Sequence, residues 1–184
     1  MARMKLIRRW SLMRNTTEEN DLEHSAMVAM IAHALCVIRN VRYGGAVDAG
    51  LALQYALYHE AAEVITGDLA SPIKYFNPEI SDAFKHIEHL ATKKMLDHLP
   101  EDLQSAYGAL LFPEKQKAEW QIVKAADKIA AYLKCMEESR HANEEFALAK
   151  RSILAQIEEI PLREVRDFMA EFVPSFGLPI DGLN

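Results

Sequence analysis

Apolar residues recur three and four positions apart along most of the chain, which is the spacing of amphipathic α-helices. The first clear segment begins at Asn20, whose side chain suits a helix N-cap. Glu23 lies where a capping box places its acidic partner. We therefore predict a helix from about residue 21 to residue 40. Its apolar face includes Met27, Val28, Ile31 and Leu35.

A second segment, from about residue 49 to residue 66, is apolar on nearly all sides, so we predict a central, buried helix. Asp48 can cap its start and Gly67 can end it. Further helices are predicted at about 79–97, 101–110, 114–140, 143–158 and 161–171. The first 14 residues suit a short amphipathic helix, residues 68–79 a loop, and the tail from Pro174 an irregular segment. No run of useful length alternates as a strand does, so the sequence predicts an all-α fold.

Composition narrows the class of protein. With 184 residues, half of them hydrophobic, the chain is long enough for one domain, which we expect to span residues 1–184. A formal net charge of -6 argues against a nucleic-acid polymer as the main partner. Cys36 and Cys135 lie in apolar helical patterns and are predicted to be reduced core thiols. We identify no signal peptide, and the longest apolar run, Ala26–Ile38, is too short to span a membrane.

The segment from Tyr58 to Asp68 concentrates one imidazole and three carboxylates within an otherwise apolar stretch. On a continuous helix, residues three and four apart share a face, so His59, Glu60 and Glu63 are expected to crowd together. Each such group costs several kcal/mol to bury unless it is paired or bound to a metal. The segment is therefore the first candidate for a functional site.

Four residues break their local hydrophobic pattern with metal-binding side chains: His24, His59, Glu60 and Asp127. Three predicted helices supply them, and a packed bundle can bring them together. Two imidazoles and two carboxylates suit Zn, Mn, Fe, Co or Ni and leave room for an open coordination position. A metal with an open position can generate hydroxide at neutral pH. Glu63, one turn further on, is placed for proton transfer rather than for binding the metal.

Two of these residues also have plainer explanations. His24 alone fits a histidine packed in the core. Asp127 alone fits a position at the edge of the apolar stripe, paired with Lys124 or Lys128. Spacing in one sequence does not decide between these explanations and a shared metal site.

The same motifs resemble those of the HD-domain metal phosphohydrolases, and more closely those of the short bacterial HD-domain 5′-deoxynucleotidases. The resemblance extends over nearly the whole chain. It is carried by the motifs Arg9–Asn15, Glu23–Ser25, Tyr58–Glu63, Thr66–Leu69, Lys74–Asn77, Ala131–Cys135 and Phe172–Phe176.

This resemblance implies a compact, all-α HD-domain helical bundle that forms a homodimer in the cytoplasm. The implied reaction is the release of phosphate from deoxyribonucleoside 5′-monophosphates with a divalent metal. By position, His24, His59, Glu60 and Asp127 would bind the metal, and Glu63 would orient or activate water.

The resemblance also implies a substrate site. Arg9 would orient the phosphate as part of the catalytic machinery, Trp10 would lie beside the nucleotide, and Asp68 would accept a hydrogen bond from the 3′-hydroxyl. The remaining residues expected at the substrate are Leu69, Ala70, Ser71, Lys74, His24 and Asp127.

The sequence departs from the family pattern at Glu60, where the family has Asp, and at Ala70, where it usually has Pro. Two other functions therefore stay open. One is a short HD-domain hydrolase of deoxynucleoside triphosphates, which should need more cations than Lys74 near its pocket. The other is a nucleotide-binding module whose activity is weakened by Glu60, although such a module has no need of an acid at Glu63.

Overall fold

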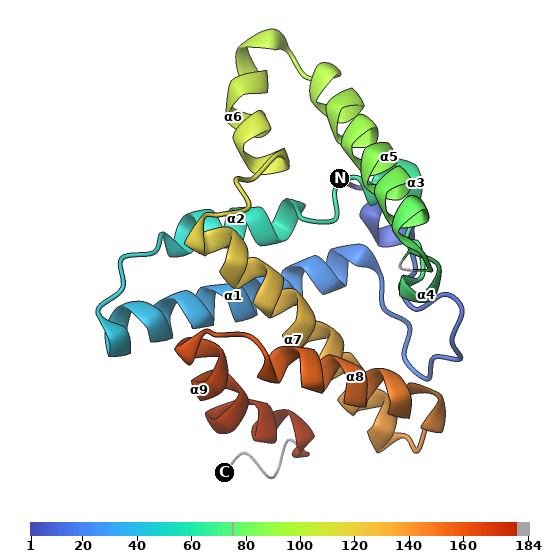
Figure 1. The fold of residues 1–184 in the computed structure, drawn as a ribbon, viewed down its shortest axis with the longest axis vertical. Helices are drawn as coiled ribbons and strands as arrows, with labels where there is room; N and C mark the ends of the chain where they lie inside the picture. The colour runs from blue at the N-terminus through green and yellow to red at the C-terminus, as the bar shows by residue number, and fades with distance from the viewer. Residues whose placement is uncertain (75, 180–184) are drawn as a thin grey trace.

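The computed structural model describes residues 1–74 and 76–179, and within these ranges the chain is helical with no strand assigned (Figure 1). The α-helices are α1 Asp21–Tyr43, α2 Ala49–Tyr58, α3 Glu63–Thr66, α4 Ser71–Lys74, α5 Pro78–Asp97, α6 Glu101–Leu111, α7 Ala118–Arg140, α8 Ala147–Glu158 and α9 Arg163–Glu171. Three short 3₁₀ helices accompany them: η1 Met4–Leu6, η2 Glu144–Phe146 and η3 Val173–Gly177. The prediction of an all-α fold is confirmed.

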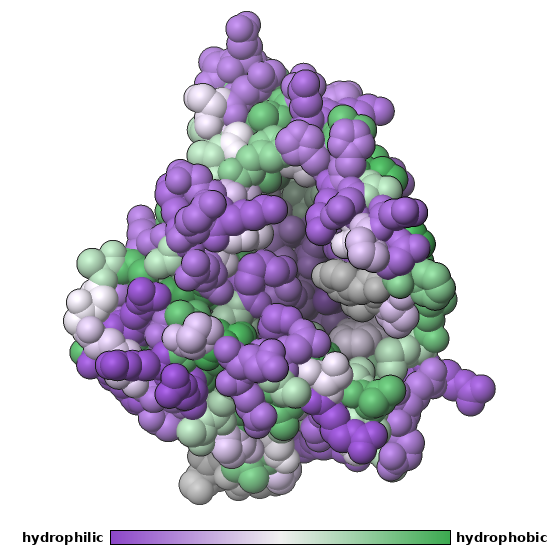
Figure 2. Space-filling view, viewed as in Figure 1, coloured by the Kyte–Doolittle hydropathy of each residue, from purple (hydrophilic) through white to green (hydrophobic). Residues whose placement is uncertain are grey.

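The core lies where α1, α2 and α7 pack against one another (Figure 1). α8 and α9 cover it on one side, while α5 and α6 form a hairpin that extends away from it on the other. In the space-filling view a hollow with mostly hydrophilic walls opens between α5 and the central helices (Figure 2). Side chains with no exposed surface in the core include Val28, Leu35, Ala52, Ala56, Ile122 and Ile129.

The start of α1 is fixed by the predicted capping box. The Asn20 side chain accepts hydrogen bonds from the amides of Leu22 and Glu23, both at 3.1 Å. The Glu23 carboxylate accepts in return from the Asn20 amide at 3.3 Å. These bonds satisfy amides that have no partner within the helix. They also set the helix so that His24, in its first turn, points into the core with no exposed surface.

The prediction of one continuous helix from 49 to 66 is wrong. α2 ends at Tyr58, and a tight turn leads to the short α3. In that turn the amide of Ala61 bonds to the carbonyl of Tyr58, and the amide of Glu63 bonds to the carbonyl of Glu60, each at 3.0 Å. His59 and Glu60 therefore lie in a bend of the chain rather than on a straight helical face. The predicted stop at Gly67 is confirmed by its positive φ of 72°.

The N-terminal segment forms η1 instead of the longer amphipathic helix that was predicted. Its backbone pairs with the residues just before α1: the Arg9 amide donates to the Glu19 carbonyl at 3.0 Å, and the Asp21 amide donates to the Ile7 carbonyl at 3.1 Å. Backbone groups used in this way are lost to a helix. The segment therefore lies across the start of α1.

Other boundaries differ less. The predicted loop 68–79 contains α4, α7 begins at Ala118 rather than near residue 114, and the segment 143–158 divides into η2 and α8. The tail contains η3 as far as Gly177, and part of it, residues 180–184, lies outside the described ranges. Both cysteines are free and buried, as predicted.

The length and composition of α1 are also those of a membrane-spanning helix. In the structure, 56% of the apolar window is buried against the rest of the chain. The helix is accordingly the central element of the core described above.

Candidate metal centre

The four residues predicted to bind a metal meet at one place. One ligand atom from each of His24, His59, Glu60 and Asp127 lies within 4.8 Å of all the others. α1 supplies the first, the end of α2 and the following turn supply the next two, and α7 supplies the last. The three converging segments are those that form the core, so the packing of the core holds the cluster together.

His24 and Asp127 form the closest pair between two segments. The Nε2 atom of His24 lies 3.1 Å from Oδ1 of Asp127, whose other oxygen accepts a hydrogen bond from Lys124 at 2.7 Å. Burial works against the charge of Asp127, yet Lys124 and the two imidazoles hold the pKa of this carboxyl well below its usual range. Burial and the charge of Arg9 lower the pKa of His24. Asp127 therefore pairs with Lys124, as its plainer explanation predicted, and also contacts His24 within the cluster.

His59 is held by one ring nitrogen and turns the other toward the cluster. Its Nδ1 atom donates to the carbonyl of Ala56 at 2.6 Å, so Nε2 is the nitrogen that faces the cluster and that would bind a metal on losing its proton. Nε2 is buried without a hydrogen-bond partner, 3.3 Å from Oε1 of Glu60 and 3.9 Å from Oδ1 of Asp127. Burial opposes a charge on the ring, but the two carboxylates outweigh it and raise the pKa of His59 to about 9.

Glu60 stays ionised for similar reasons. Burial disfavours its charge, but His59 and then Arg9 attract it, and the pKa of Glu60 falls far below its usual range. Its Oε1 atom lies 3.7 Å from Nη1 of Arg9. Two ionised carboxylates beside two imidazoles fit the ligand set of a divalent transition metal. The donor chemistry therefore agrees with a metal site.

Arg9 and Trp10 reach the cluster from the N-terminal segment. The Nε atom of Arg9 and the Nε1 atom of Trp10 both donate to Oε2 of Glu19, at 3.2 and 3.3 Å. The Trp10 ring packs on Phe146 with centroids 5.3 Å apart. The backbone of Trp10 has a φ of 56°, a left-handed conformation that costs a bulky residue about 1–3 kcal/mol. Backbone strain of this kind is concentrated at active sites and ligand-binding segments.

The loop that carries these residues is anchored to α7. The buried carboxylate of Glu138 accepts hydrogen bonds from the amides of Thr16 and Thr17 and from the Thr16 hydroxyl, at 2.7 to 3.2 Å. It also pairs with Lys134, whose ammonium group donates to the Thr17 carbonyl. Asn143 donates to the same carboxylate at 2.8 Å. The loop is thus fixed twice: the pairing of Arg9 with Glu19 joins its ends, and Glu138 holds it at Thr16 and Thr17.

Glu63 begins α3 and is nearly buried, next to a second acid that the sequence did not single out. This is Asp21, which has no exposed surface, forms a carboxyl contact with Glu63 and lies 4.0 Å from Nη1 of Arg9. Burial raises the pKa of Asp21 to about 6, although Glu63 and Arg9 oppose the shift. Burial, then the charges of Glu60 and Asp21, raise the pKa of Glu63 to about 11.

Asp21 was missed for a reason. An acid in the first turn of a helix is ordinary, because it complements the helix dipole. Only the folding of the N-terminal segment over α1 buries it. Glu19 was missed as well, since it lies in a polar stretch that reads as a connector.

The remaining residues predicted to contact the substrate differ in their burial and in their contacts. Asp68 is half-buried, and burial raises its pKa while Arg9 opposes the shift, so the two groups interact electrostatically. Leu69 and Ala70 are half-buried beside it, and Ser71 begins α4, although its side chain is not among those described. Lys74 is turned toward α5, where it pairs with Glu88 at 2.8 Å and lies over Phe84. The charge of Lys74 also lowers the pKa of Asp68, so the two substrate candidates interact electrostatically.

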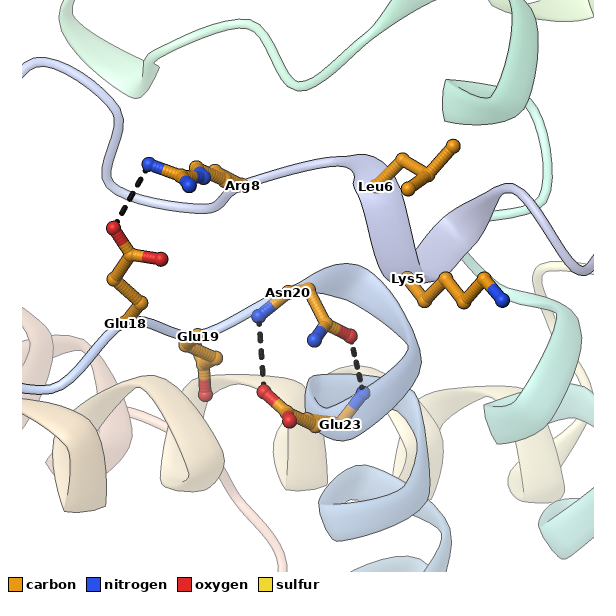
Figure 3. A pocket seen from close by; sticks show the side chains of 7 residues that line it. All are labelled: Lys5, Leu6, Arg8, Glu18, Glu19, Asn20 and Glu23. Carbon is orange, nitrogen blue, oxygen red and sulfur yellow. Dashed lines mark hydrogen bonds and ion pairs between the residues drawn. The ribbon is translucent and has the colours of Figure 1, made fainter.

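Two cavities flank the N-terminal segment. One of about 380 Å³ is lined by Lys5, Leu6, Arg8, Glu18, Glu19, Asn20 and Glu23 (Figure 3). A second, of about 200 Å³, lies on the side of Arg9 and shares Arg8, Glu18 and Glu19 with the first. None of the four metal-binding candidates lines either cavity, so both lie beside the cluster rather than over it.

Comparison with known proteins gives consistent matches. A family model described as 5′-deoxynucleotidase YfbR-like matches residues 1–176. A 5′-deoxynucleotidase of Shewanella oneidensis is 46% identical over 100% of this chain and 95% of its own length. 5′-deoxynucleotidase YfbR of Escherichia coli is 45% identical over 100% of this chain and 93% of its own.

Solved structures agree on the fold. The crystal structure of an HD-domain phosphohydrolase from Listeria innocua has a TM-score of 0.85 at 25% identity, over 95% of this chain and 85% of that one. A cyanophage S-2L HD phosphohydrolase, solved with dA and one catalytic Zn²⁺ ion, has a TM-score of 0.66 at 22% identity, over 95% of this chain and 93% of its own. At that lower identity the likeness concerns the fold.

Proposed function

This chain belongs to the YfbR-like 5′-deoxynucleotidase family, and from that membership we propose that it is a metal-dependent hydrolase of deoxyribonucleoside 5′-monophosphates. Water attacks the phosphorus atom, the bond from phosphorus to the 5′-oxygen breaks, and the 5′-oxygen takes up a proton. The products are a deoxyribonucleoside and inorganic phosphate. The observation that carries the proposal is the convergence of four metal-binding side chains beside Arg9 and Glu63.

His24, His59, Glu60 and Asp127 are the residues that would hold the metal. The unpartnered Nε2 of His59 and the two ionised carboxylates support this assignment. When bound, a divalent ion supplies an acidified water molecule and positive charge for the phosphoryl oxygens. The donor set suits Co, Mn, Zn, Fe or Ni, and among these the natural metal is open to measurement.

The protein's own side chains bind and orient the substrate. Arg9 contributes a planar guanidinium group that matches the geometry of a phosphate, and its position next to Glu60 brings it to the metal cluster. Trp10 contributes an aromatic face beside the nucleotide. Asp68, half-buried near Arg9, accepts a hydrogen bond from the 3′-hydroxyl. The resemblance to the family further implies that Leu69, Ala70 and Ser71 lie at the substrate.

Glu63 acts as the general acid or base for the attacking water. Its carboxyl group is nearly buried and lies within one turn of Glu60, close to where water must be oriented for attack. A positioned acid or base of this kind contributes roughly 10²- to 10⁴-fold to the rate. Lys74 pairs with Glu88, and its charge also lowers the pKa of Asp68, which is proposed to meet the sugar. The full-length relatives named 5′-deoxynucleotidase support a monophosphate rather than a triphosphate substrate.

The wider setting is part of the same proposal. The family match over residues 1–176 supports a single HD-type domain across the chain. The resemblance supports a homodimer in the cytoplasm, and the net charge of -6 supports a small nucleotide rather than a nucleic-acid polymer as the ligand.

The test is a panel of dAMP, AMP and dATP against Co²⁺, Mn²⁺, Zn²⁺, Fe²⁺ and Ni²⁺, with products separated by chromatography. We expect phosphate and deoxyadenosine from dAMP, with at least one metal, at a rate well above that for AMP. Triphosphate release from dATP without hydrolysis of dAMP would establish the triphosphate hydrolase instead. Nucleotide-dependent thermal stabilisation without any product would establish the binding module.

A further inference from the structure

Glu19 holds together the two side chains proposed to meet the nucleotide. One of its oxygens, Oε2, accepts both the Arg9 Nε hydrogen at 3.2 Å and the Trp10 Nε1 hydrogen at 3.3 Å. The side chain of Glu19 is only 17% exposed and that of Arg9 only 13%. A shielded charged hydrogen bond of this kind is stronger than one on the surface.

The backbone fixes Glu19 from both directions. Its carbonyl accepts from the Arg9 amide at 3.0 Å, and the next residue, Asn20, is the N-cap of α1 and forms an isolated bridge with Arg8. Figure 3 shows the Glu19 side chain pointing away from Arg8 and Glu18. The backbone at Glu19 is therefore held both by its pairing with Arg9 and by its place just before the capped start of α1.

The neighbouring pair provides a contrast. Arg8 and Glu18 also form an ion pair, at 2.8 Å, but their side chains are 70% and 66% exposed. Such a surface pair contributes little. The two pairs differ by one position in sequence, so they offer a matched comparison between a buried and an exposed contact.

The hydrogen bonds to Glu19 fix the orientation of the Arg9 and Trp10 side chains. Because Nε of Arg9 bonds to Glu19, the guanidinium plane is fixed and the terminal nitrogens face inward, with Nη1 3.7 Å from Oε1 of Glu60. Two-point binding of a phosphate needs a fixed plane of this kind. The second hydrogen bond holds the indole of Trp10, whose backbone is strained.

We propose that Glu19 is a positioning residue that fixes Arg9 and Trp10 together for the 5′-monophosphate and its nucleoside. This inference rests on the proposed function, because it takes its substrate from there. The other oxygen of Glu19, Oε1, lies 3.9 Å from Nδ1 of His24, which is why the test below is run with saturating metal. Glu19 itself touches no reacting atom. Its role is to make the arginine and the tryptophan one preformed unit, so that the substrate does not have to order them on binding.

The test compares Glu19→Ala and Glu19→Gln with the control Glu18→Gln, all with saturating metal. We expect Glu19→Ala to raise the KM for dAMP by roughly tenfold to a hundredfold, as loss of a charged hydrogen bond implies, with a smaller change in kcat. Glu19→Gln keeps an acceptor oxygen and should recover part of the loss. Glu18→Gln should match the parent. Equal fall in kcat for both Glu19 variants with KM unchanged would overturn the proposal.

A spectroscopic arm does not depend on turnover. The chain has two tryptophans, so in a Trp120→Phe background, with excitation chosen to avoid tyrosine, the emission comes from Trp10. In that background Glu19→Ala should shift the emission of Trp10 to the red, and Glu19→Gln should shift it less. Unchanged emission in both variants would overturn the role of Glu19. Failure of the parent to hydrolyse any deoxynucleotide, with the emission shift present, would instead count against the proposed function.

Discussion

The Nε2 atom of His24 lies 3.1 Å from Oδ1 of Asp127, although the two residues are 103 positions apart in the chain. The contact joins α1 to α7 at the point where both helices pass through the core. A ligand pair placed there cannot separate unless the core also opens. Helical packing therefore brings His24 and Asp127 together, and the turn after α2 adds His59 and Glu60.

Replacing Glu63 tests the proton-handling role. Glu63→Gln keeps the size of the side chain but removes its acid, so we expect kcat for dAMP to fall roughly 10²- to 10⁴-fold with metal content unchanged. The measurement is turnover at saturating substrate alongside elemental analysis of the same sample. Turnover near that of the parent would remove Glu63 from the mechanism.

The residue at position 60 tests the departure from the family pattern. Glu60→Asp shortens the ligand by one methylene, which moves its carboxylate away from Arg9, now 3.7 Å distant. We expect both forms to bind one equivalent of metal, with a different order of preference among Co²⁺, Mn²⁺ and Zn²⁺, because the donor type is unchanged and only its reach differs. Competitive metal titrations measure this. If neither form bound metal, Glu60 could not be a ligand.

Asp21 is predicted to reduce stability at neutral pH. Its pKa in the folded protein is about 6, whereas an unfolded chain gives about 4. Between these values the folded state holds more protons than the unfolded state, so stability falls as the pH rises through this window and stays lower above it. An asparagine at position 21 does not titrate, so the Asp21→Asn variant should not lose stability in this way.

The corresponding experiment is urea unfolding of the parent and Asp21→Asn, both without added metal, at pH 4 and pH 7.5. We expect the difference in unfolding free energy to shift in favour of Asp21→Asn by about 1 to 3 kcal/mol at the higher pH. A difference that is the same at both pH values would show that the carboxyl is not strained by its burial.

The anchor of the N-terminal loop is predicted to be strongly stabilising. Glu138→Leu leaves the buried Lys134 ammonium without a carboxylate, although it keeps the Thr17 carbonyl, and breaking a buried ion pair in this way typically costs about 3 to 5 kcal/mol. Adding Lys134→Met should recover part of this loss but not all of it, because the amides of Thr16 and Thr17 still lack their acceptor. Denaturant unfolding of the two single variants and the double variant measures the effect. A cost below about 1 kcal/mol for Glu138→Leu would contradict the anchor.

The sequence predicted the helices well where local rules govern them. The Asn20 capping box and the stop at Gly67 depend only on neighbouring residues, and both are found in the structure. The break after Tyr58 coincides with a side-chain hydrogen bond instead. His59 Nδ1 bonds to the Ala56 carbonyl, an acceptor that a continuing helix reserves for the amide four residues on. No glycine or proline marks that break in the sequence.

The residues of the candidate site likewise fall into those that the sequence indicated and those that it did not. His24, His59, Glu60 and Asp127 stood out because each breaks an apolar pattern, and the structure brings them together. Asp21 and Glu19 lie in polar surroundings in the sequence, so no pattern was broken. Their burial arises only when the N-terminal segment folds back across α1, a contact between segments that periodicity does not encode.

The most direct measurement is an anomalous difference map from crystals grown with Zn²⁺, for the parent and for Asp127→Ala. We predict a single strong peak in the parent, about 2.0 to 2.2 Å from one atom of each of His24, His59, Glu60 and Asp127. The Asp127→Ala crystals should lack that peak or show it much weakened. A parent map with no peak among these four side chains, or with its peak on other residues, would contradict the account.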